Sequence, residues 1–239
     1  MIHNLYKGEI ELEYKDDVHK YFANGKQVES VTEILKVVAK PNLIPWAVQT
    51  GIQHIKNEIK EGKYSLEEFD KILDSAQKKH INLKNEASDT GRFFHAWIEN
   101  HIKGIEQPIP ENEWAKKSIE NFLNWVKESE ITFTESEVLL YSKGFKYAGR
   151  ADFIARYKDG LILGDIKTSK SIYPEMYLQT AAYKRAYEEE RKCYINKRLI
   201  LHFNKEGELN IVENPNYLKD FTGFKGALNL HRRLKELEE

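Results

Sequence analysis

The sequence has almost no cysteine and no long apolar run. Its single cysteine, Cys193, excludes a disulfide within one chain and any zinc or iron–sulfur site built from several cysteines. No apolar stretch approaches the roughly 20 residues that a membrane-spanning helix needs, so we expect no membrane association. The opening residues, MIHNLYKGEIELEY, have neither the apolar core of a signal peptide nor the composition of a transit peptide. We therefore expect a cytoplasmic protein.

The chain also has almost no net charge. The 37 basic and 38 acidic side chains give −1 at pH 7, so the composition as a whole carries no basic footprint for nucleic acid. Apolar and aromatic residues are plentiful, because 41% of the 239 residues are hydrophobic and 13 are Tyr, 11 Phe and 4 Trp. This composition excludes a disordered chain and favours a single domain over residues 1–239, or a core with an appended helical lobe.

The predicted secondary structure changes in character near residue 128. Residues 1–128 predict a hairpin at Asn24-Gly25 and then a helical lobe, with helices at 30 to about 40, 43–60, 65–79, 85–103 and 111–128. In residues 129–239 strands and helices alternate. Strands are expected at 131–142, 147–158, 161–168, 197–203 and 208–212, with helices at 173–191 and from 217. This predicts an α/β core with a central mixed sheet flanked by helices.

Charged residues stand at the end of a strand that should be buried. Asp159-Gly160 is a favoured two-residue turn, which predicts that strands 147–158 and 161–168 pair antiparallel with Lys158 opposite Leu161. In that register Asp152 lies opposite Lys167 and diagonal to Asp165. Because strand side chains alternate, these three share one face, and the other face carries Phe153, Ile162 and Ile166.

Buried charge is costly unless it is paired or binds a metal. Two carboxylates suit a hard cation such as Mg²⁺, and an ammonium stabilises developing negative charge, so Asp152, Asp165 and Lys167 are candidate catalytic residues. The alternative is a structural ion pair between Lys167 and one of the aspartates. For an isolated D-x-K sequence the structural pair is the commoner outcome.

Two helices carry further candidates. Gln179 and Tyr183 are four residues apart and share a helix face just after the hairpin. Gly91, His95 and Glu99 are also spaced by four, on the helix at 85–103. Taken alone, the first pair fits ordinary helix surface, and a His and Glu at this spacing are usually a helix pair or a partly buried His.

The order of these motifs resembles that of the RecB-type exonuclease branch of the PD-(D/E)XK nuclease superfamily. The motifs are, in chain order, G-x3-H-x3-E, G-R-A-D, D-I-K and Q-x3-Y. The likeness is greatest to the mitochondrial genome maintenance exonuclease and its phage and bacterial relatives. It covers SVTEIL (30–35), Trp46, GRFFHAWIE (91–99), YAGRADFIARY (147–157), GDIKTS (164–169) and LQTAAY (178–183). The resemblance implies a restriction-endonuclease-like core with the helical lobe added at the N-terminal side.

The resemblance also implies roles for individual residues. A Mg²⁺ or Mn²⁺ ion would be held by His95, Asp152, Asp165 and the carbonyl of Ile166, and Lys167 would be the catalytic lysine. Gln179 and Tyr183 would position Lys167 or the substrate phosphate.

The remaining implied roles are less specific. Glu99 and Glu137 would order water beside the metal or serve as structural acids. Arg150 and Lys170 flank the site and would bind phosphate, or would be ordinary surface charges. Trp46, Phe93, Phe94 and Trp97 are candidates for stacking on bases, although helical periodicity favours a core position for most of them.

Two departures from the family pattern matter. Ala151 stands where many members have Pro before the first aspartate, which leaves the chemistry unchanged. Relatives with an iron–sulfur cluster carry four cysteines, so Cys193 alone excludes that subgroup.

The implied activity is metal-dependent hydrolysis of DNA phosphodiesters from free ends of a single strand, with the helical lobe restricting the site to a threaded strand. DNA repair, recombination and phage DNA processing, in a bacterium or a phage-infected cell, all fit. Two alternatives stay open: a structure-specific or flap endonuclease of the same fold, and a non-catalytic nucleic-acid-binding protein built on a nuclease fold. The sequence identifies no protein partner.

Overall fold

The computed structural model describes residues 2–38, 40–41, 43–59, 64–158 and 160–238. The chain forms two compact units: residues 1–38 together with 94–239, here the sheet unit, and residues 39–93, here the helical unit. This division does not coincide with the boundary expected at residue 128, and the single-domain description stays a prediction. In the described part of the chain, no helix is long and apolar enough to cross a membrane.

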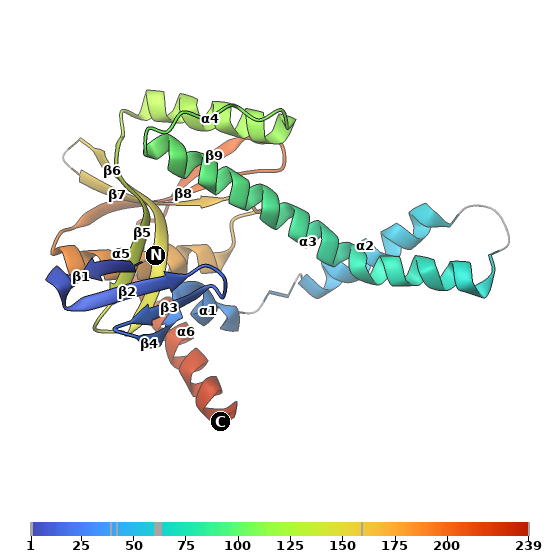
Figure 1. Ribbon diagram of the computed structural model, residues 1–239, viewed down its shortest axis with the longest axis horizontal. Helices are drawn as coiled ribbons and strands as arrows, with labels where there is room; N and C mark the ends of the chain where they lie inside the picture. The colour runs from blue at the N-terminus through green and yellow to red at the C-terminus, as the bar shows by residue number, and fades with distance from the viewer. Residues whose placement is uncertain (1, 39, 42, 60–63, 159, 239) are drawn as a thin grey trace. The chain divides into compact units, whose positions relative to one another are not determined.

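A mixed sheet forms the centre of the sheet unit (Figure 1). Its strands are β1 (Ile2–Leu5), β2 (Ile10–Lys15), β3 (Lys20–Ala23), β4 (Lys26–Ser30), β5 (Thr132–Ser142), β6 (Tyr147–Tyr157), β7 (Gly160–Lys167), β8 (Ile195–Phe203) and β9 (Leu209–Glu213). The order is β1-β2-β3-β4-β6-β7-β8-β9, and β5 pairs with β6. The pairs β4–β6 and β7–β8 are parallel, and the other pairs are antiparallel. The expected α/β class with a mixed sheet is confirmed.

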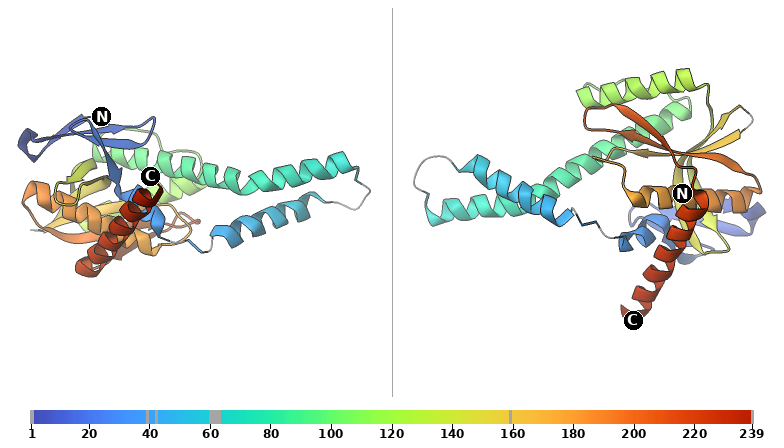
Figure 2. Two further views of the ribbon diagram at one scale, coloured as in Figure 1. Left: turned by 90° about the horizontal axis from the view of Figure 1, so that it is seen from below. Right: turned by 180° about the vertical axis from the view of Figure 1, so that it is seen from behind.

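Helices cover both faces of this sheet. The helices of the sheet unit are α1 (Val31–Ile34), the end of α3 (Leu66–Ile102), α4 (Glu113–Ser129), α5 (Pro174–Arg191) and α6 (Tyr217–Glu238), with short 3-10 turns at Tyr6–Gly8 and Leu35–Val37. Helix α2 (Leu43–Glu58) and the rest of α3 belong to the helical unit. Figures 1 and 2 show α5 and α6 on one side and α4 with the C-terminal part of α3 on the other. One core joins Ile154 and Leu163 to α5 and α6, and the other joins Phe153 and Ile162 to α3 and α4.

Two helices differ from expectation. The helix that Ser30 caps was expected to reach about residue 40, but α1 ends at Ile34 and gives way to a 3-10 turn, where β-branched Val37 and Val38 precede Pro41. The Ser30 hydroxyl accepts the Glu33 N–H at 3.0 Å and so caps the N-terminus of α1. The helices expected at 65–79 and 85–103 are one helix, α3, because residues 80–84 contain no Gly or Pro to break it.

The β6–β7 hairpin forms, but the predicted register is wrong. Tyr157 pairs with Gly160 and Phe153 with Gly164, so the pairing is shifted by two residues from Lys158 opposite Leu161. Lys158 adopts a left-handed φ of 50°, and Asp159, on which the prediction placed the turn, lies outside the described residues. An even shift preserves the faces, so the prediction that Phe153, Ile162 and Ile166 share one core is confirmed.

The helical unit contains α2 and the part of α3 up to Phe93. The side chain and backbone N–H of Ser65 both contact the Glu68 carboxylate, which forms a capping box at the start of α3. Among the residues described, α2 buries none of its side chains fully, and Trp46 (38% exposed) touches the His80 ring edge-on. This unit therefore presents much apolar surface.

Candidate active site

Two glycines of the sequence motifs leave room for aromatic rings that pack directly against the strand backbone. A Cβ on Gly164 would lie 1.8 Å from the Phe153 ring, and one on Gly149 would lie 2.5 Å from the Tyr183 ring. Neither position has room for a larger residue. Gly149 and Gly164 are the glycines of the G-R-A-D and G-D-I-K stretches, so these stretches need glycine for packing as much as for chemistry.

Strands β6 and β7 stop pairing at the level of Asp152. The last pair in that direction is Phe153 with Gly164, and the next free N–H on β7, that of Ile166, donates to Asp152 Oδ2 at 2.5 Å. A buried backbone N–H needs an acceptor, and here a carboxylate supplies it. Asp152 is thereby fixed in place. The predicted role of Ile166, as a carbonyl ligand, stays a prediction.

His95, Glu137 and Asp152 form the candidate metal group. Each offers one ligand atom, and these atoms all lie within 4.8 Å of one another. His95 Nδ1 is 3.2 Å from Asp152 Oδ1. Helix α3 brings His95 here because its neighbours Phe94 and Ile98 are buried in the core against the sheet.

Glu137 has an unusual backbone conformation. It lies on β5 directly across from Asp152, between the pairs Ser136–Phe153 and Val138–Ala151, and its φ is 49°. Left-handed φ is rare for a residue with a long side chain and costs about 1–3 kcal/mol. Such strain persists where the surroundings impose it, often at functional sites.

Asp165 and Lys167 form an ion pair beside this group. The Asp165 side chain is 2% exposed and that of Lys167 19% exposed. Among the described residues, Asp165 is not part of the group that gathers within 4.8 Å. The structure thus brings His95 and Asp152 together, with Glu137 as the third member of this group, and the predicted role of Asp165 as a metal ligand stays a prediction.

The carboxylates of the site differ in acidity. Burial, together with the charge of Asp152, raises the pKa of Glu137 to about 7 against the lowering effect of Arg150. Burial likewise raises the pKa of Asp165 to about 6, although Lys167 opposes it. Burial also acts to raise the pKa of Asp152, but His95, Lys167 and the Ile166 N–H outweigh it, and the pKa falls.

The cationic groups respond to the same carboxylates. Burial lowers the pKa of Lys167, but Asp165 and Asp152 more than offset it, so the pKa is raised and the ammonium stays charged. Burial acts on His95 in the same way, and Asp152 reverses it, so the pKa of His95 is also raised. A metal bound through His95 would therefore compete with a proton at this imidazole.

Gln179 and Tyr183 lie together on α5, as their spacing predicts. Gln179 Nε2 donates to the Tyr183 hydroxyl at 2.8 Å. Tyr183 is buried, and burial with the nearby charge of Asp165 raises its pKa well above the usual value. The phenol therefore stays protonated beside Asp165.

The other expected residues have different surroundings. Arg150 Nε lies 2.7 Å from Glu137 Oε2. Glu99 forms an ion pair with Lys103, the residue that follows the end of its helix, and Lys170 is exposed. Phe94 and Trp97 are buried in the core, whereas Phe93 is 47% exposed.

The donor set fits a hard divalent cation. One imidazole with carboxylate oxygens is the ligand chemistry of Mg²⁺ or Mn²⁺ rather than of a thiolate-bound metal. His95, Glu137 and Asp152 would hold such an ion. The sequence does contain a signal for the position of Glu137, because pairing 131–142 with 147–158 across the turn after Ser142 puts Glu137 opposite Asp152.

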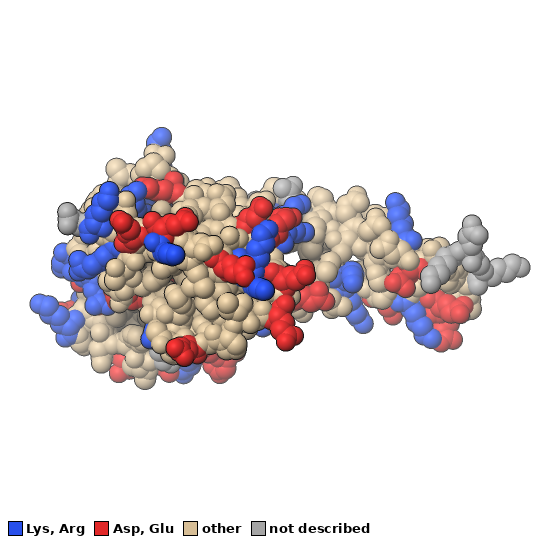
Figure 3. All heavy atoms as spheres, turned by 90° about the horizontal axis from the view of Figure 1, so that it is seen from above, with Lys and Arg blue, Asp and Glu red and all other residues tan. Residues whose placement is uncertain are grey.

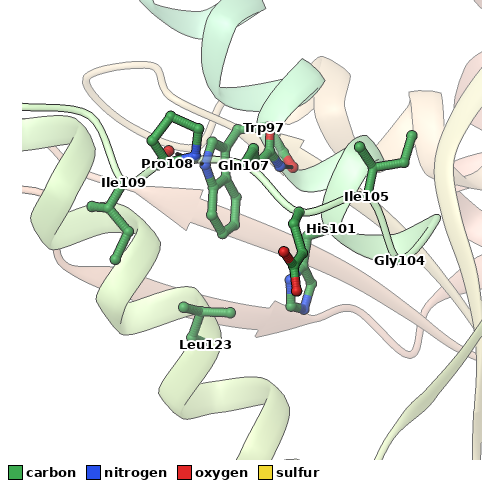
Figure 4. A pocket seen from close by; sticks show the side chains of 9 residues that line it. Trp97, His101, Gly104, Ile105, Gln107, Pro108, Ile109 and Leu123 are labelled. Atoms are coloured by element: carbon green, nitrogen blue, oxygen red, sulfur yellow. Dashed lines mark hydrogen bonds between the residues drawn. The ribbon is translucent and has the colours of Figure 1, made fainter.

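A pocket elsewhere in the sheet unit lacks the metal-binding groups of the candidate site. It lies between α3, α4 and the segment 104–109, and Figure 4 shows Trp97, His101, Ile109 and Leu123 around it. Its lining contains a single carboxylate, that of Glu106. It therefore has no pair of carboxylates to hold a hard cation.

Surface charge does not mark a binding face by itself. On the face shown in Figure 3, Lys and Arg side chains are interspersed with Asp and Glu. This agrees with the net charge of −1. Any contact with an anionic substrate must come from individually placed cations.

No protein-family model matches the sequence, and no curated protein matches it significantly. Among solved structures, one similar chain is from Eubacterium rectale, and its name gives it provisionally as an exonuclease. The identity is 13% over 63% of this chain and 69% of that chain, with a TM-score of 0.42. Another is an alkaline exonuclease from Laribacter hongkongensis, 9% identical over 80% of this chain and 91% of that chain, with a TM-score of 0.35. The functional conclusion therefore rests on the geometry of the site.

Proposed function

We propose that the protein is a metal-dependent nuclease that hydrolyses phosphodiester bonds. The observation that carries this proposal is the gathering of His95, Glu137 and Asp152 within 4.8 Å beside the buried Asp165–Lys167 pair. A carboxylate–imidazole group with an adjacent lysine whose pKa is raised suits attack of water on a phosphate diester. A purely structural ion pair would not require the histidine and the second strand.

The residues of the chain have separate tasks in this reaction. A Mg²⁺ or Mn²⁺ ion, when bound, polarises the phosphate and makes water more acidic. Asp152, fixed by the Ile166 N–H, orients the metal group. Lys167, kept charged by Asp165, stabilises negative charge as it develops on the phosphate oxygens. Tyr183 and Gln179 present neutral hydrogen-bonding groups behind Asp165.

The finer proposal is a DNA exonuclease that acts on single strands with a free end, in DNA repair, recombination or phage DNA processing in the cytoplasm. It is supported by the resemblance of the sequence over residues 91–187 to RecB-type exonucleases. The division into an α/β unit and a helical unit is compatible with it.

The test uses end-labelled linear and circular single-stranded DNA, with Mg²⁺, with Mn²⁺ and with a chelator. Metal-dependent loss of the linear DNA alone, abolished by Asp152→Asn and by Lys167→Ala, supports the exonuclease. Cutting of the circle replaces it with the endonuclease. DNA binding without cleavage under any metal leaves a nucleic-acid-binding protein on a nuclease fold.

A further inference from the structure

Arg150 is held from two sides. Its Nε lies 2.7 Å from Glu137 Oε2, and its guanidinium carbon lies 5.0 Å from the centre of the Tyr14 ring. Tyr14 is on β2, in a part of the chain far from Glu137 and Arg150. Side chains from β2 and β5 therefore hold the guanidinium of an arginine on β6 in one position. A surface arginine without a specific role does not need such fixation.

Tyr14 is itself fixed. It is 6% exposed, its ring packs against that of Tyr21 at 4.7 Å between centres, and its hydroxyl is 2.8 Å from His19 Nδ1. A rigid aromatic face under a guanidinium attracts the cation and restricts its rotamers. The position of Arg150 is thus set before any substrate arrives.

The far end of Arg150 is free. In the part of the chain that the structure describes, no oxygen forms a hydrogen bond with its two terminal nitrogens, and the side chain is 33% exposed. A planar pair of N–H groups that is anchored at Nε and open at its end matches two oxygens of a phosphate.

Glu137 links this arginine to the metal group. Its Oε2 contacts Arg150, and the same carboxylate belongs to the set with His95 and Asp152. Arg150 and a cation at that set therefore compete for one negative charge. An anion on Arg150 would weaken this competition, so each ligand should favour the other.

We propose that Arg150 binds a phosphate of the strand being cut, and that Tyr14 and Glu137 are positioning residues that hold its guanidinium beside the metal group. This inference rests on the proposed nuclease function and deepens it. Phosphate and metal binding are coupled through Glu137. Removal of Arg150 should weaken binding of the strand and, at the same time, tighten binding of the metal.

The test measures the two ligands separately and needs no cleavage. Binding of a labelled single-stranded oligonucleotide is followed by fluorescence anisotropy in the presence of a chelator. Binding of Mn²⁺ is followed by calorimetry without DNA. For Arg150→Gln we expect oligonucleotide affinity to fall on the order of tenfold and Mn²⁺ affinity to rise several-fold. Arg156→Gln is the matched control, because Arg156 is an exposed arginine on the same strand.

Two further variants separate positioning from charge. Arg150→Lys keeps the charge and loses the planar fork, so it should leave Mn²⁺ affinity unchanged and still lose oligonucleotide affinity. Tyr14→Phe keeps the ring and should bind the oligonucleotide within about twofold of wild type, whereas Tyr14→Ala should lose several-fold. Thermal denaturation confirms that each variant is folded.

The proposal fails if Arg150→Gln behaves like Arg156→Gln, or if it weakens Mn²⁺ binding. It also fails if Tyr14→Ala binds the oligonucleotide as tightly as Tyr14→Phe does. These outcomes are distinct from failure of the nuclease function, which the cleavage assay reports independently.

Discussion

Two ion pairs lie at the candidate active site, one beside the metal group and one that includes its Glu137, and they differ in surroundings and in origin. The inner pair, Asp165 with Lys167, is formed within one strand by residues 2% and 19% exposed. The outer pair, Glu137 with Arg150, joins two strands, and its side chains are 11% and 33% exposed. The inner pair has little access to water and suits the chemical step. The outer pair is open at one end and suits binding.

The largest effect should come from breaking the inner pair. Lys167→Ala removes the charge that stabilises the reacting phosphate and should lower the cleavage rate by about 10²–10³. It also leaves Asp165 buried without its cation, which destabilises a protein by roughly 3–5 kcal/mol. Cleavage rates and chemical denaturation measure the two effects. Comparison with the double variant Asp165→Asn/Lys167→Met separates them, because that variant should recover stability and not activity.

Changing the outer acid should have a smaller and different effect. Glu137→Gln keeps the shape and removes one carboxylate from the candidate metal group, so Mn²⁺ affinity should fall by about 10–100-fold. Stability at pH 8 should not fall, since a buried carboxylate with a raised pKa favours folding only when it is neutral. Calorimetry and thermal denaturation check both points. Unchanged Mn²⁺ affinity would remove Glu137 from the site.

The two pairs predict a common pH dependence. The folded protein raises the pKa of Glu137 from 4.5 to about 7 and that of Asp165 from 3.8 to about 6. A raised carboxyl pKa stabilises the folded state fully below the unfolded value, and this contribution is lost as pH rises through the folded value. The metal-free protein should therefore lose stability between about pH 4 and pH 7.

Mn²⁺ should show the opposite trend, because it binds the ionised carboxylates and neutral His95. Its affinity should rise over about pH 5 to pH 8, and the Glu137→Gln variant should show a shallower rise. Calorimetric titrations at several pH values measure this. An affinity that is flat or falls with rising pH would contradict the assignment of these acids to the metal.

The smallest effect should come from a charge beside the site that belongs to neither pair. Lys170 is exposed, so Lys170→Ala should change stability by less than about 0.5 kcal/mol. If it touches phosphate at all, oligonucleotide affinity should fall by only a few-fold and become less sensitive to salt. A loss as large as that of Arg150→Gln would make Lys170 an equal partner in binding.

The Asp165–Lys167 pair could be predicted from the sequence because the two residues are close together in the chain. Asp165 and Lys167 are two residues apart on a short apolar strand, and alternation alone puts them on one face with Asp152. The exact register could not be predicted, since it depends on which residues form the connection between the two strands, and the predicted and observed registers differ by two residues. The register error left each side chain on the predicted face of the sheet but assigned it the wrong partner on the neighbouring strand.

The outer pair was harder to predict because it is not local. Arg150 was a candidate through its place next to Asp152, but its contact with Tyr14 depends on how a hairpin from the first 30 residues packs. The left-handed φ of Glu137 also cannot be read from residue type, since Glu rarely adopts it. Long-range packing imposes both features.

The most direct measurement locates the metal itself. Crystals soaked with Mn²⁺ and measured near the manganese absorption edge would show the ion as an anomalous peak. We predict a peak in contact with His95, Glu137 and Asp152, with Lys167 still paired to Asp165. A peak bound by Asp165 without Glu137, or no peak at this site, would contradict the assignment of the metal group.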